Sequence, residues 1–260
     1  MLIFDFDGVL MNSIKEITVT AYNAVTGKLV TGIEYIPREV VRMFQQNRFH
    51  VQAIGDTLCL MRWCMENRGG DPNQILTKEQ YSLIVRQEPE PPVDRTKRFF
   101  STRAAFIKKD EMRWLSLNEP YRPLWEELLK LTPERVILLT NKNRDAVMRL
   151  CRHFGMTLIE ENVYSGDEGV SKFDNLRKIH KRFNRHPYDF IDDSLKNLRD
   201  LDRHFNKQTV FIRPMLALWG YTGPRDGLLA RKAGYTTFNQ HEFIAFIKSE
   251  PSVSLTMGLH

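Results

Sequence analysis

The segment Leu2-Ile3-Phe4-Asp5-Phe6-Asp7-Gly8-Val9-Leu10 combines a short apolar run with two acids and a glycine, the pattern of a buried strand followed by a turn. Its first part, Leu2 to Phe6, is a short apolar run of the kind that forms a strand buried on both faces of a sheet. Asp5 and Asp7 lie two positions apart, so in extended backbone both carboxylates point to the same side at the carboxyl edge of that strand. Like charges this close need a cation or a shared proton, and Gly8 permits a sharp turn after them. The segment predicts a ligand site at the edge of a parallel sheet, although an exposed turn would have the same local pattern.

Alternating strand and helix patterns recur in the second half of the chain. Further short apolar runs predict strands at Val136 to Thr140, Asp189 to Asp192 and Thr209 to Ile212. Helical spacing is found at Asp145 to Phe154, at Asn175 to Phe183, and at Leu195, Leu198, Leu201 and Phe205. Strands that alternate with helices imply a parallel sheet covered on both faces. The predicted fold class is therefore α/β, with a Rossmann-like parallel-sheet core.

A long stretch without a convincing strand separates the first strand from the others. Ser13-Ile14-Lys15-Glu16 has the form of a capping box and predicts a helix start. Further helices are expected at Pro37 to Asn47, Val51 to Asn67 and Thr96 to Leu115, with breaks at Gly69 to Asn73 and Glu88 to Pro92. Asn118-Glu119-Pro120 marks the return to the core. We predict a core of residues 1–12 and 118–260 and an inserted, mainly α-helical domain of residues 13–117.

Three later segments place polar residues beside predicted strand ends or helix starts. Thr140 and Asn141 offer a hydroxyl and an amide that can hold a phosphate oxygen without adding charge. Lys172, just before a helix, can neutralise phosphoryl oxygens and carboxylates. Asp192 and Asp193 can contribute oxygen ligands to Mg²⁺, which binds few carboxylates together with water and substrate oxygens. Each segment alone also fits a helix cap or a solvated surface residue.

The four segments together, in this order and at these spacings, resemble the haloacid dehalogenase superfamily. The similarity is to its phosphatase-like members, of the phosphoglycolate phosphatase type, which have a helical cap inserted after the first motif. It extends over the whole chain, because Trp219 to Tyr235 is similar to the segment that follows the fifth core strand in that family. The resemblance implies a magnesium-dependent phosphatase that hydrolyses a small phosphorylated metabolite through an aspartyl-phosphate intermediate.

The resemblance also implies a role for each polar residue of the four segments. Asp5 is the nucleophile, and Asp7 is the general acid and base. Thr140, the backbone of Asn141, and Lys172 bind the transferring phosphoryl group. Asp193 is the principal magnesium ligand, Asp5 and the carbonyl of Asp7 are further ligands, and Asp192 is a secondary ligand or a partner of Lys172. Asn12 stands where many relatives have an aspartate, so the surroundings of the site are expected to differ.

Asp7 bears on the choice among functions within this family. Members that displace halide have no acid at this position, so dehalogenation is disfavoured. A phosphomutase shares the core chemistry and stays an alternative, whereas a non-catalytic binding protein is disfavoured because Asp5 and Lys172 are both present. An unperturbed aspartate has a pKa of about 3.9, so we expect acidic neighbours, Asp5 and the Asp192-Asp193 pair, to help Asp7 hold a proton.

Composition excludes few functions. The chain has 260 residues, is 42% hydrophobic and carries a formal charge of +6, which favours anionic ligands of any kind. The basic residues form no recognised nucleic-acid-binding signature, and the spacing of Cys59, Cys64 and Cys151 predicts buried free thiols. No long apolar run and no signal-peptide pattern is present, so we expect a cytoplasmic protein that acts on a small phosphorylated substrate, away from nucleic acid and membranes. The pattern does not indicate an oligomeric state.

One segment of the predicted insertion is a candidate for substrate selection. Gln45 to His50 offers polar and cationic groups between two helical stretches. We expect Arg48 and His50 to contact the distal anionic group of a substrate, with exposed surface residues as the alternative interpretation.

Overall fold

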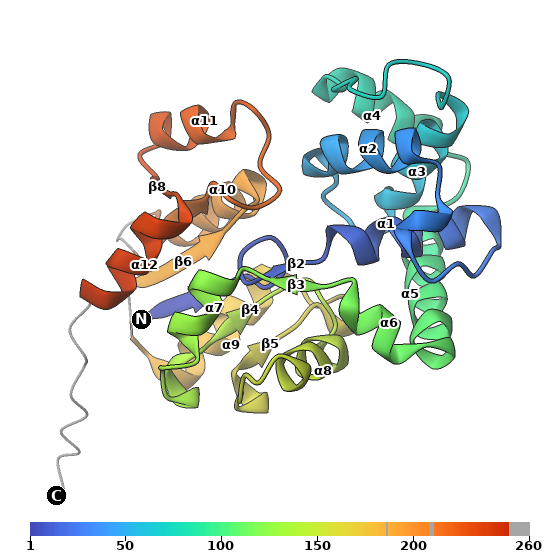
Figure 1. The fold of residues 1–260 in the computed structure, drawn as a ribbon. Helices are drawn as coiled ribbons and strands as arrows, with labels where there is room; N and C mark the ends of the chain where they lie inside the picture. The colour runs from blue at the N-terminus through green and yellow to red at the C-terminus, as the bar shows by residue number, and fades with distance from the viewer. Residues whose placement is uncertain (186, 208–210, 250–260) are drawn as a thin grey trace, which may run out of the picture.

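A six-stranded parallel sheet forms the core of the protein, as the strand and helix alternation predicted (Figure 1). The computed structural model describes residues 1–185, 187–207 and 211–249. The strand order is β5-β4-β1-β6-β7-β8. The bounds are β1 (Leu2–Phe4), β4 (Leu138–Leu139), β5 (Val163–Tyr164), β6 (Tyr188–Asp192), β7 (Ile212–Ala217) and β8 (Thr236–Phe238). The first strand is central, and its Phe4 pairs with Leu138 of β4 and Ile191 of β6.

The strand predicted at Thr209 to Ile212 lies further along the chain, at Ile212–Ala217. Residues 209 and 210 of that prediction lie outside the described residues. Pro214 disfavours a central strand at this position, because proline has no backbone N–H to donate to a neighbouring strand. The structure accommodates it because Pro214 pairs with Phe190 of β6 before β8 begins to pair, at Met215. The short strands β5 and β8 were not predicted.

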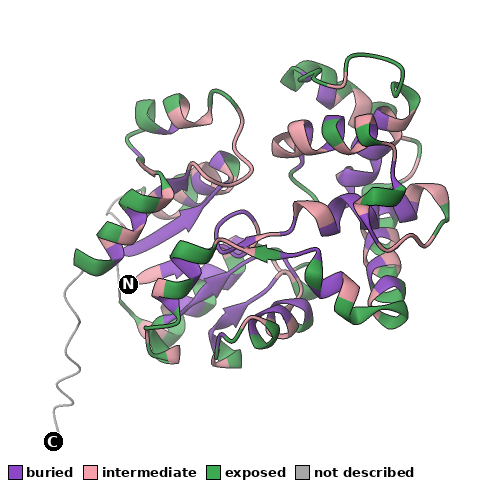
Figure 2. Cartoon of the chain, in the orientation of Figure 1, coloured by how far each residue is buried: buried purple, intermediate pink, exposed green. Residues whose placement is uncertain are grey.

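Helices cover both faces of the sheet, and the strands between them are mostly buried (Figure 2). Consecutive strand residues contribute to opposite faces. Ile3 and Phe190 pack in one hydrophobic cluster, and Phe4 and Ile191 pack in the other. The first face is covered by α9 (Lys172–Phe183), α10 (Leu195–Phe205) and α11 (Asp226–Lys232), and the second by α7 (Arg122–Leu128), α8 (Arg144–His153) and α12 (Gln240–Ser249). The helices predicted at Asp145 to Phe154, Asn175 to Phe183 and Leu195 to Phe205 are confirmed. Asn239 and Glu242 form a reciprocal cap at the start of α12.

Residues between β2 and β3 form helices, which lie beside the sheet in Figure 1. They are α1 (Ile14–Thr26), α2 (Arg38–Asn47), α3 (Asp56–Glu66), α4 (Lys78–Gln87), α5 (Pro92–Lys109) and α6 (Glu111–Ser116). Helix α4 was not predicted, and the helix expected from Thr96 to Leu115 is divided at Asp110, which caps α6 through Arg113 N. Both predicted breaks are the loops on either side of α4.

The two connections to these helices pair with each other. β2 (Met11–Asn12) and β3 (Glu119–Pro120) form an antiparallel ribbon. The capping box predicted at Ser13 and Glu16 is wrong, because the Ser13 side chain makes no cap hydrogen bond at the start of α1. Asn12 Oδ1 instead accepts from Ile14 N at 3.2 Å. The Ser13 hydroxyl donates to Asp7 at 2.6 Å, and Glu16 is fully buried in an ion pair with Arg103. Partners outside the helix therefore replace the reciprocal cap between Ser13 and Glu16.

The three cysteines are free and buried, as predicted. Among the helices of the described residues, none combines the length and the apolar composition that a membrane span requires.

Candidate active site

Asp5 lies at the carboxyl end of β1, buried between its neighbouring strands. Its backbone N–H donates to Ile191 O at 2.9 Å, which fixes the residue against β6. One carboxylate oxygen, Oδ1, accepts from Phe6 N at 2.8 Å, and Oδ2 lies 3.0 Å from Lys172 Nζ. Lys172 also donates to Asp192 Oδ2 at 2.6 Å. Asp5 and Asp192 are thus brought together as their positions at strand ends predicted, and Lys172, at the start of α9, lies between them.

Burial changes the titration of these groups. It raises the pKa of Asp5 to about 7, although the nearby Lys172 ammonium acts in the opposite direction. Burial would by itself lower the pKa of Lys172, but the carboxylates of Asp192 and Asp5 outweigh it and raise that pKa. For Asp193, burial and then the charges of Asp192 and Asp5 raise the pKa well above its usual range. One buried cation therefore does not offset three buried acids.

Asp192 and Asp193 are adjacent but have different partners. Asp192 Oδ1 accepts from Ser194 N at 2.7 Å, and its Oδ2 accepts from Asn197 Nδ2 at 3.0 Å as well as from Lys172. Asp193 Oδ2 accepts from Tyr221 N at 2.6 Å. Both carboxylate oxygens of Asp192 thus accept hydrogen bonds. For Asp193, the hydrogen bond found within the described residues is to Oδ2. Asp193 retains more capacity to bind a ligand.

Three carboxylates meet the geometric requirement for a shared cation. Asp5, Asp192 and Asp193 each offer an oxygen, and these oxygens lie within 4.8 Å of one another. All three residues are buried. Oxygen ligands with excess negative charge suit a hard divalent cation such as Mg²⁺.

Thr140 and Asn141 follow β4 at the same edge of the sheet. Thr140 is buried, its N–H donates to Tyr164 O at 3.0 Å, and its hydroxyl accepts from Lys142 N at 3.1 Å. Asn141 is exposed. The turn after β4 therefore has one buried hydroxyl and one exposed residue.

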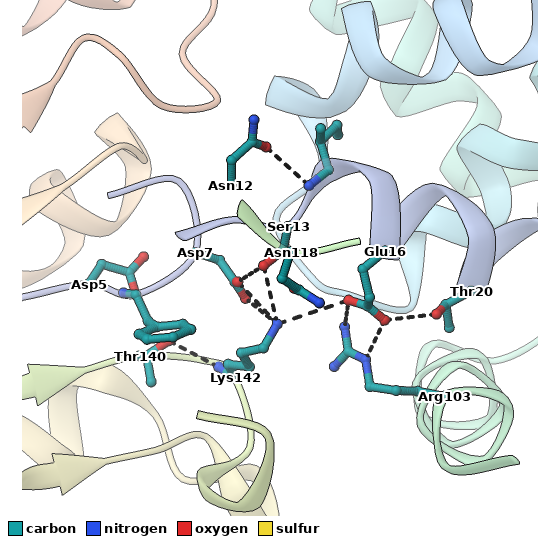
Figure 3. Close-up of polar contacts among 12 residues, drawn as sticks. Asp5, Asp7, Asn12, Ser13, Glu16, Thr20, Arg103, Asn118, Thr140 and Lys142 are labelled. Carbon is teal, nitrogen blue, oxygen red and sulfur yellow. Dashed lines mark hydrogen bonds and ion pairs between the residues drawn. The ribbon is translucent and has the colours of Figure 1, made fainter. Parts of the chain in front are cut away.

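The surroundings of Asp7 differ from the acidic setting that we expected. Its Oδ1 accepts from the Ser13 hydroxyl at 2.6 Å, and Lys142 Nζ lies 3.1 Å from Oδ1 and 3.3 Å from Oδ2 (Figure 3). The groups that contact this carboxylate are thus a hydroxyl and an ammonium. Sequence reasoning identified Lys172 as a cation for the site but missed Lys142, the cation that contacts Asp7.

Lys142 and Glu16 were missed by sequence reasoning. Lys142 lies two residues after Thr140, within the turn that the sequence marks as a phosphate-binding candidate, and this position was an available signal. Glu16 is followed by the uncharged stretch Ile17 to Gly27, and an acid at the start of such a stretch was a second signal. Neither signal reveals its partner, because the pairing depends on tertiary structure.

Arg48 and His50 lie in a short 3₁₀ segment after α2. The Arg48 guanidinium lies 5.1 Å from the centre of the Tyr221 ring, and Tyr221 N in turn contacts Asp193. His50 stacks on Tyr81, with ring centres 5.1 Å apart, and its Nε2 lies 2.8 Å from Leu76 O. Arg48 thus approaches the core site, whereas the described contacts of His50 lie among the inserted helices.

No protein-family model matches the chain, and no curated protein sequence matches it significantly. Solved structures are similar over most of its length. A predicted phosphoglycolate phosphatase from Haemophilus somnus has a TM-score of 0.56 at 16% identity, over 95% of this chain and 96% of that one. A predicted phosphatase from Clostridium acetobutylicum has a TM-score of 0.54 at 14% identity, over 95% and 97%. A protein assigned as a haloacid dehalogenase-like hydrolase from Bacteroides fragilis has a TM-score of 0.57 at 12% identity, over 92% and 94%. The chain therefore has the haloacid dehalogenase fold.

Proposed function

We propose that this protein is a phosphatase that transfers a phosphoryl group from a small phosphorylated metabolite to Asp5 and then to water. One observation carries the proposal: Asp5 is buried at the carboxyl end of the central strand, with its Oδ2 3.0 Å from Lys172 Nζ. A lysine beside a buried carboxylate can bind the equatorial oxygens of a phosphoryl group that approaches that carboxylate. The fold, shared with proteins assigned as phosphatases, agrees with this chemistry.

The buried acids fit a magnesium ion. Asp5, Asp192 and Asp193 together exceed the charge of Lys172, and the pKa values of Asp5 and Asp193 are raised by burial. A divalent cation would relieve that excess. We propose that Asp193 and Asp5 hold Mg²⁺ directly, that the carbonyl of Asp7 is a third ligand, and that Asp192 orients Lys172. When bound, Mg²⁺ would stabilise the negative charge that develops on the transferring phosphoryl oxygens.

In the first step, an oxygen of Asp5 attacks phosphorus and the bond between phosphorus and the ester oxygen breaks. Asp7 gives its proton to the departing alkoxide, which leaves as an alcohol. The hydroxyl of Thr140, the backbone of Asn141 and the ammonium of Lys172 hold the phosphoryl oxygens throughout. These groups position the transferring phosphoryl group and stabilise the charge spread over its equatorial oxygens.

In the second step, Asp7 accepts a proton from water while the water oxygen attacks phosphorus. The bond between phosphorus and the Asp5 oxygen breaks, which releases inorganic phosphate and restores the Asp5 carboxylate. Asp7 is then protonated again, ready for the next ester. The two steps together consume one ester and one water and yield one alcohol and one phosphate.

We further propose that the inserted helices act as a cap that selects the substrate. The guanidinium of Arg48 lies over Tyr221, whose N–H contacts Asp193, so it is suited to bind a distal anionic group of a substrate. Because His50 is engaged with Tyr81 and Leu76, we assign it to the support of this segment.

The test is hydrolysis of a panel of phosphate esters, comprising p-nitrophenyl phosphate, sugar phosphates, phosphoglycolate and nucleotides. Release of inorganic phosphate is measured with Mg²⁺ and again after EDTA. We expect turnover that requires Mg²⁺ and is restored when Mg²⁺ is added back. Absence of turnover across the panel in a folded, magnesium-loaded protein would contradict the proposal.

A further inference from the structure

A chain of alternating charges leads from Asp7 into the inserted helices (Figure 3). Asp7 contacts Lys142 Nζ at 3.1 and 3.3 Å. On its other side, Lys142 Nζ lies 4.0 Å from Glu16 Oε2. Glu16 accepts two hydrogen bonds from Arg103, from Nε to Oε1 and from NH2 to Oε2, each of 2.8 Å. The order is acid, base, acid, base, so the charges of the four groups balance.

Three of the four side chains in this network are buried. The side chains of Lys142 and Glu16 are 0% exposed, and that of Arg103 is 4% exposed. Burial would raise the pKa of Glu16, but the charges of Arg103 and Lys142 outweigh it and hold that pKa below its usual range. A buried charge is costly unless it is paired and hydrogen-bonded. Each of these residues therefore depends on its neighbours for a stable position.

The four residues come from separate parts of the fold. Asp7 follows β1, and Lys142 lies in the turn between β4 and α8, where its N–H donates to the Thr140 hydroxyl at 3.1 Å. Glu16 belongs to α1 and Arg103 to α5, both among the inserted helices. The pair formed by Lys142 and Glu16 thus joins the sheet to the insertion beside the β2 and β3 ribbon. Asp7 is held from both sides, since Ser13, just before α1, also donates to it.

We propose that Lys142 is the positioning residue of Asp7, and that Glu16 and Arg103 fix Lys142 from the inserted helices. The inference rests on the proposed phosphatase function, in which Asp7 exchanges a proton with the ester oxygen. Ser13 and Lys142 both contact Oδ1, whereas Oδ2 accepts the longer contact of 3.3 Å from Lys142. Oδ1 therefore has two partners and Oδ2 has one, so we assign the proton transfer to Oδ2. The position of the Asp7 carboxylate then depends on the position of the inserted helices.

The test compares esters whose leaving groups need a proton to different extents. The ratio kcat/KM reports the steps up to phosphoryl transfer to Asp5. For an alkyl phosphate such as glycerol phosphate, we expect Lys142→Met to lower kcat/KM by about 100-fold, the order of effect of a misplaced catalytic group. For p-nitrophenyl phosphate, whose leaving group needs little protonation, we expect a loss of less than about fivefold. Lys142→Arg, which retains the charge, should recover part of the alkyl phosphate activity.

Helix α5 supplies a matched pair of variants for the cap side of the network. Arg95 and Arg103 are both buried in α5, and each pairs with a carboxylate, Arg95 with Asp56 at 2.6 Å and Arg103 with Glu16. Asp56 belongs to α3 and is no member of the network. Arg103→Met should reduce alkyl phosphate hydrolysis more than aryl phosphate hydrolysis. Arg95→Met should lose stability without changing the ratio of the two rates.

The outcomes separate this inference from the proposed function. If wild-type protein hydrolyses neither of these esters and none of the panel described above, or if Asp5→Asn remains active, the proposed function is wrong. If wild type is active and Asp5→Asn is not, equal losses for both esters in Lys142→Met would show a merely structural role and overturn the inference. Circular dichroism establishes that each variant is folded. If Lys142→Met does not fold, Arg103→Met is compared with Arg95→Met. The same ratio of alkyl to aryl phosphate hydrolysis in those two variants would overturn the inference.

Discussion

Gly8 lies directly against the carboxylate of Asp193. A Cβ added to Gly8 would be 1.9 Å from Asp193 Oδ2, far inside van der Waals contact. The backbone of Gly8 has φ of +83°, in the left-handed region, where a side chain is unfavourable. Gly220 approaches the same residue, since a Cβ added to it would be 2.4 Å from Asp193 Cβ. Two glycines therefore form the walls around one proposed metal ligand.

Gly8→Ala is expected to displace Asp193 and to remove most magnesium-dependent activity. Gly27 is the matched control, because it has φ of +70° and an added Cβ would meet nothing within 4 Å. Gly27→Ala should cost only the backbone strain, about 1–2 kcal/mol in the free energy of unfolding, with activity retained. Urea unfolding and Mg²⁺ titration of both variants check this. Equal magnesium requirements in the two variants would show that contact with Asp193 is unimportant.

Asp5→Asn is expected to lower turnover by at least about three orders of magnitude, because an amide cannot act as the attacking anion. The control is Asp189→Asn. Asp189 is a buried acid that pairs with Leu2 at the amino end of β1 and forms an ion pair with Arg213. The Asp189→Asn variant should retain activity, although its Tm should fall. Acid-quenched labelling with a ³²P ester should trap a phosphoenzyme in wild type and in Asp189→Asn, and turnover of Asp5→Asn within tenfold of wild type would remove Asp5 from this role.

Magnesium should bind more tightly as pH rises. The pKa of Asp5 is raised from 3.8 to about 7 in the folded, metal-free protein, so between these values the folded state binds more protons than the unfolded state. This group therefore favours the folded state at low pH, and its contribution is lost as pH rises from about 4 to about 7. Magnesium must displace those protons. We expect Mg²⁺ to increase Tm more at pH 7.5 than at pH 5.5. In Asp5→Asn, the Tm increases at the two pH values should differ less than in wild type. An equal Mg²⁺ effect at both pH values would contradict this.

Asp193→Asn should raise the Mg²⁺ concentration for half-maximal activity more than Asp192→Asn does. Asp192 already accepts from Lys172, Ser194 and Asn197, whereas Asp193 accepts from Tyr221 N and retains more ligand capacity. Loss of Asp192 should mainly destabilise the fold, because it leaves Lys172 with one acidic partner fewer. Magnesium titrations and thermal melts of the two variants separate these effects. The reverse ranking would make Asp192 the direct ligand.

The candidate site was largely predictable because its residues follow strand ends. Asp5, Thr140 and Asp193 each lie just beyond an apolar run, and the carboxyl ends of parallel strands meet at one edge of the sheet. This inference needs only the direction of the strands and not their exact bounds. The same reasoning explains why the misplacement of β7 did not affect the site.

The network at Asp7 was not predictable, because local patterns favoured a different structure. Ser13 and Glu16 match a capping box in sequence, yet Glu16 binds Arg103, 87 positions away, and Asp7 binds Lys142, 135 positions away. A helix cap contributes only about 1 kcal/mol, whereas an unpaired buried charge costs several. Tertiary pairing therefore outweighs the local motif, and spacing alone does not identify the partner.

Arg48 is expected to select the substrate. The segment that carries Arg48 meets the loop after β7, where Arg48 lies over Tyr221 and a Cβ added to Gly223 would be 2.7 Å from the Phe49 ring. A charge-assisted hydrogen bond contributes about 1.5–3 kcal/mol. Arg48→Met should therefore lower kcat/KM by about 10- to 100-fold for an ester with a second anionic group, such as phosphoglycolate.

Hydrolysis of p-nitrophenyl phosphate should change little in Arg48→Met, because its reacting end contacts only the core. Arg42, exposed on the preceding helix α2, provides the control, and Arg42→Met should leave the ranking of substrates unchanged. His50→Ala should lower Tm through loss of its contacts with Tyr81 and Leu76 while the ranking of substrates is preserved. If Arg48→Met and Arg42→Met give the same relative kcat/KM across the panel, Arg48 does not select the substrate. The chemistry assigned to Asp5 would then stand with its specificity determined elsewhere.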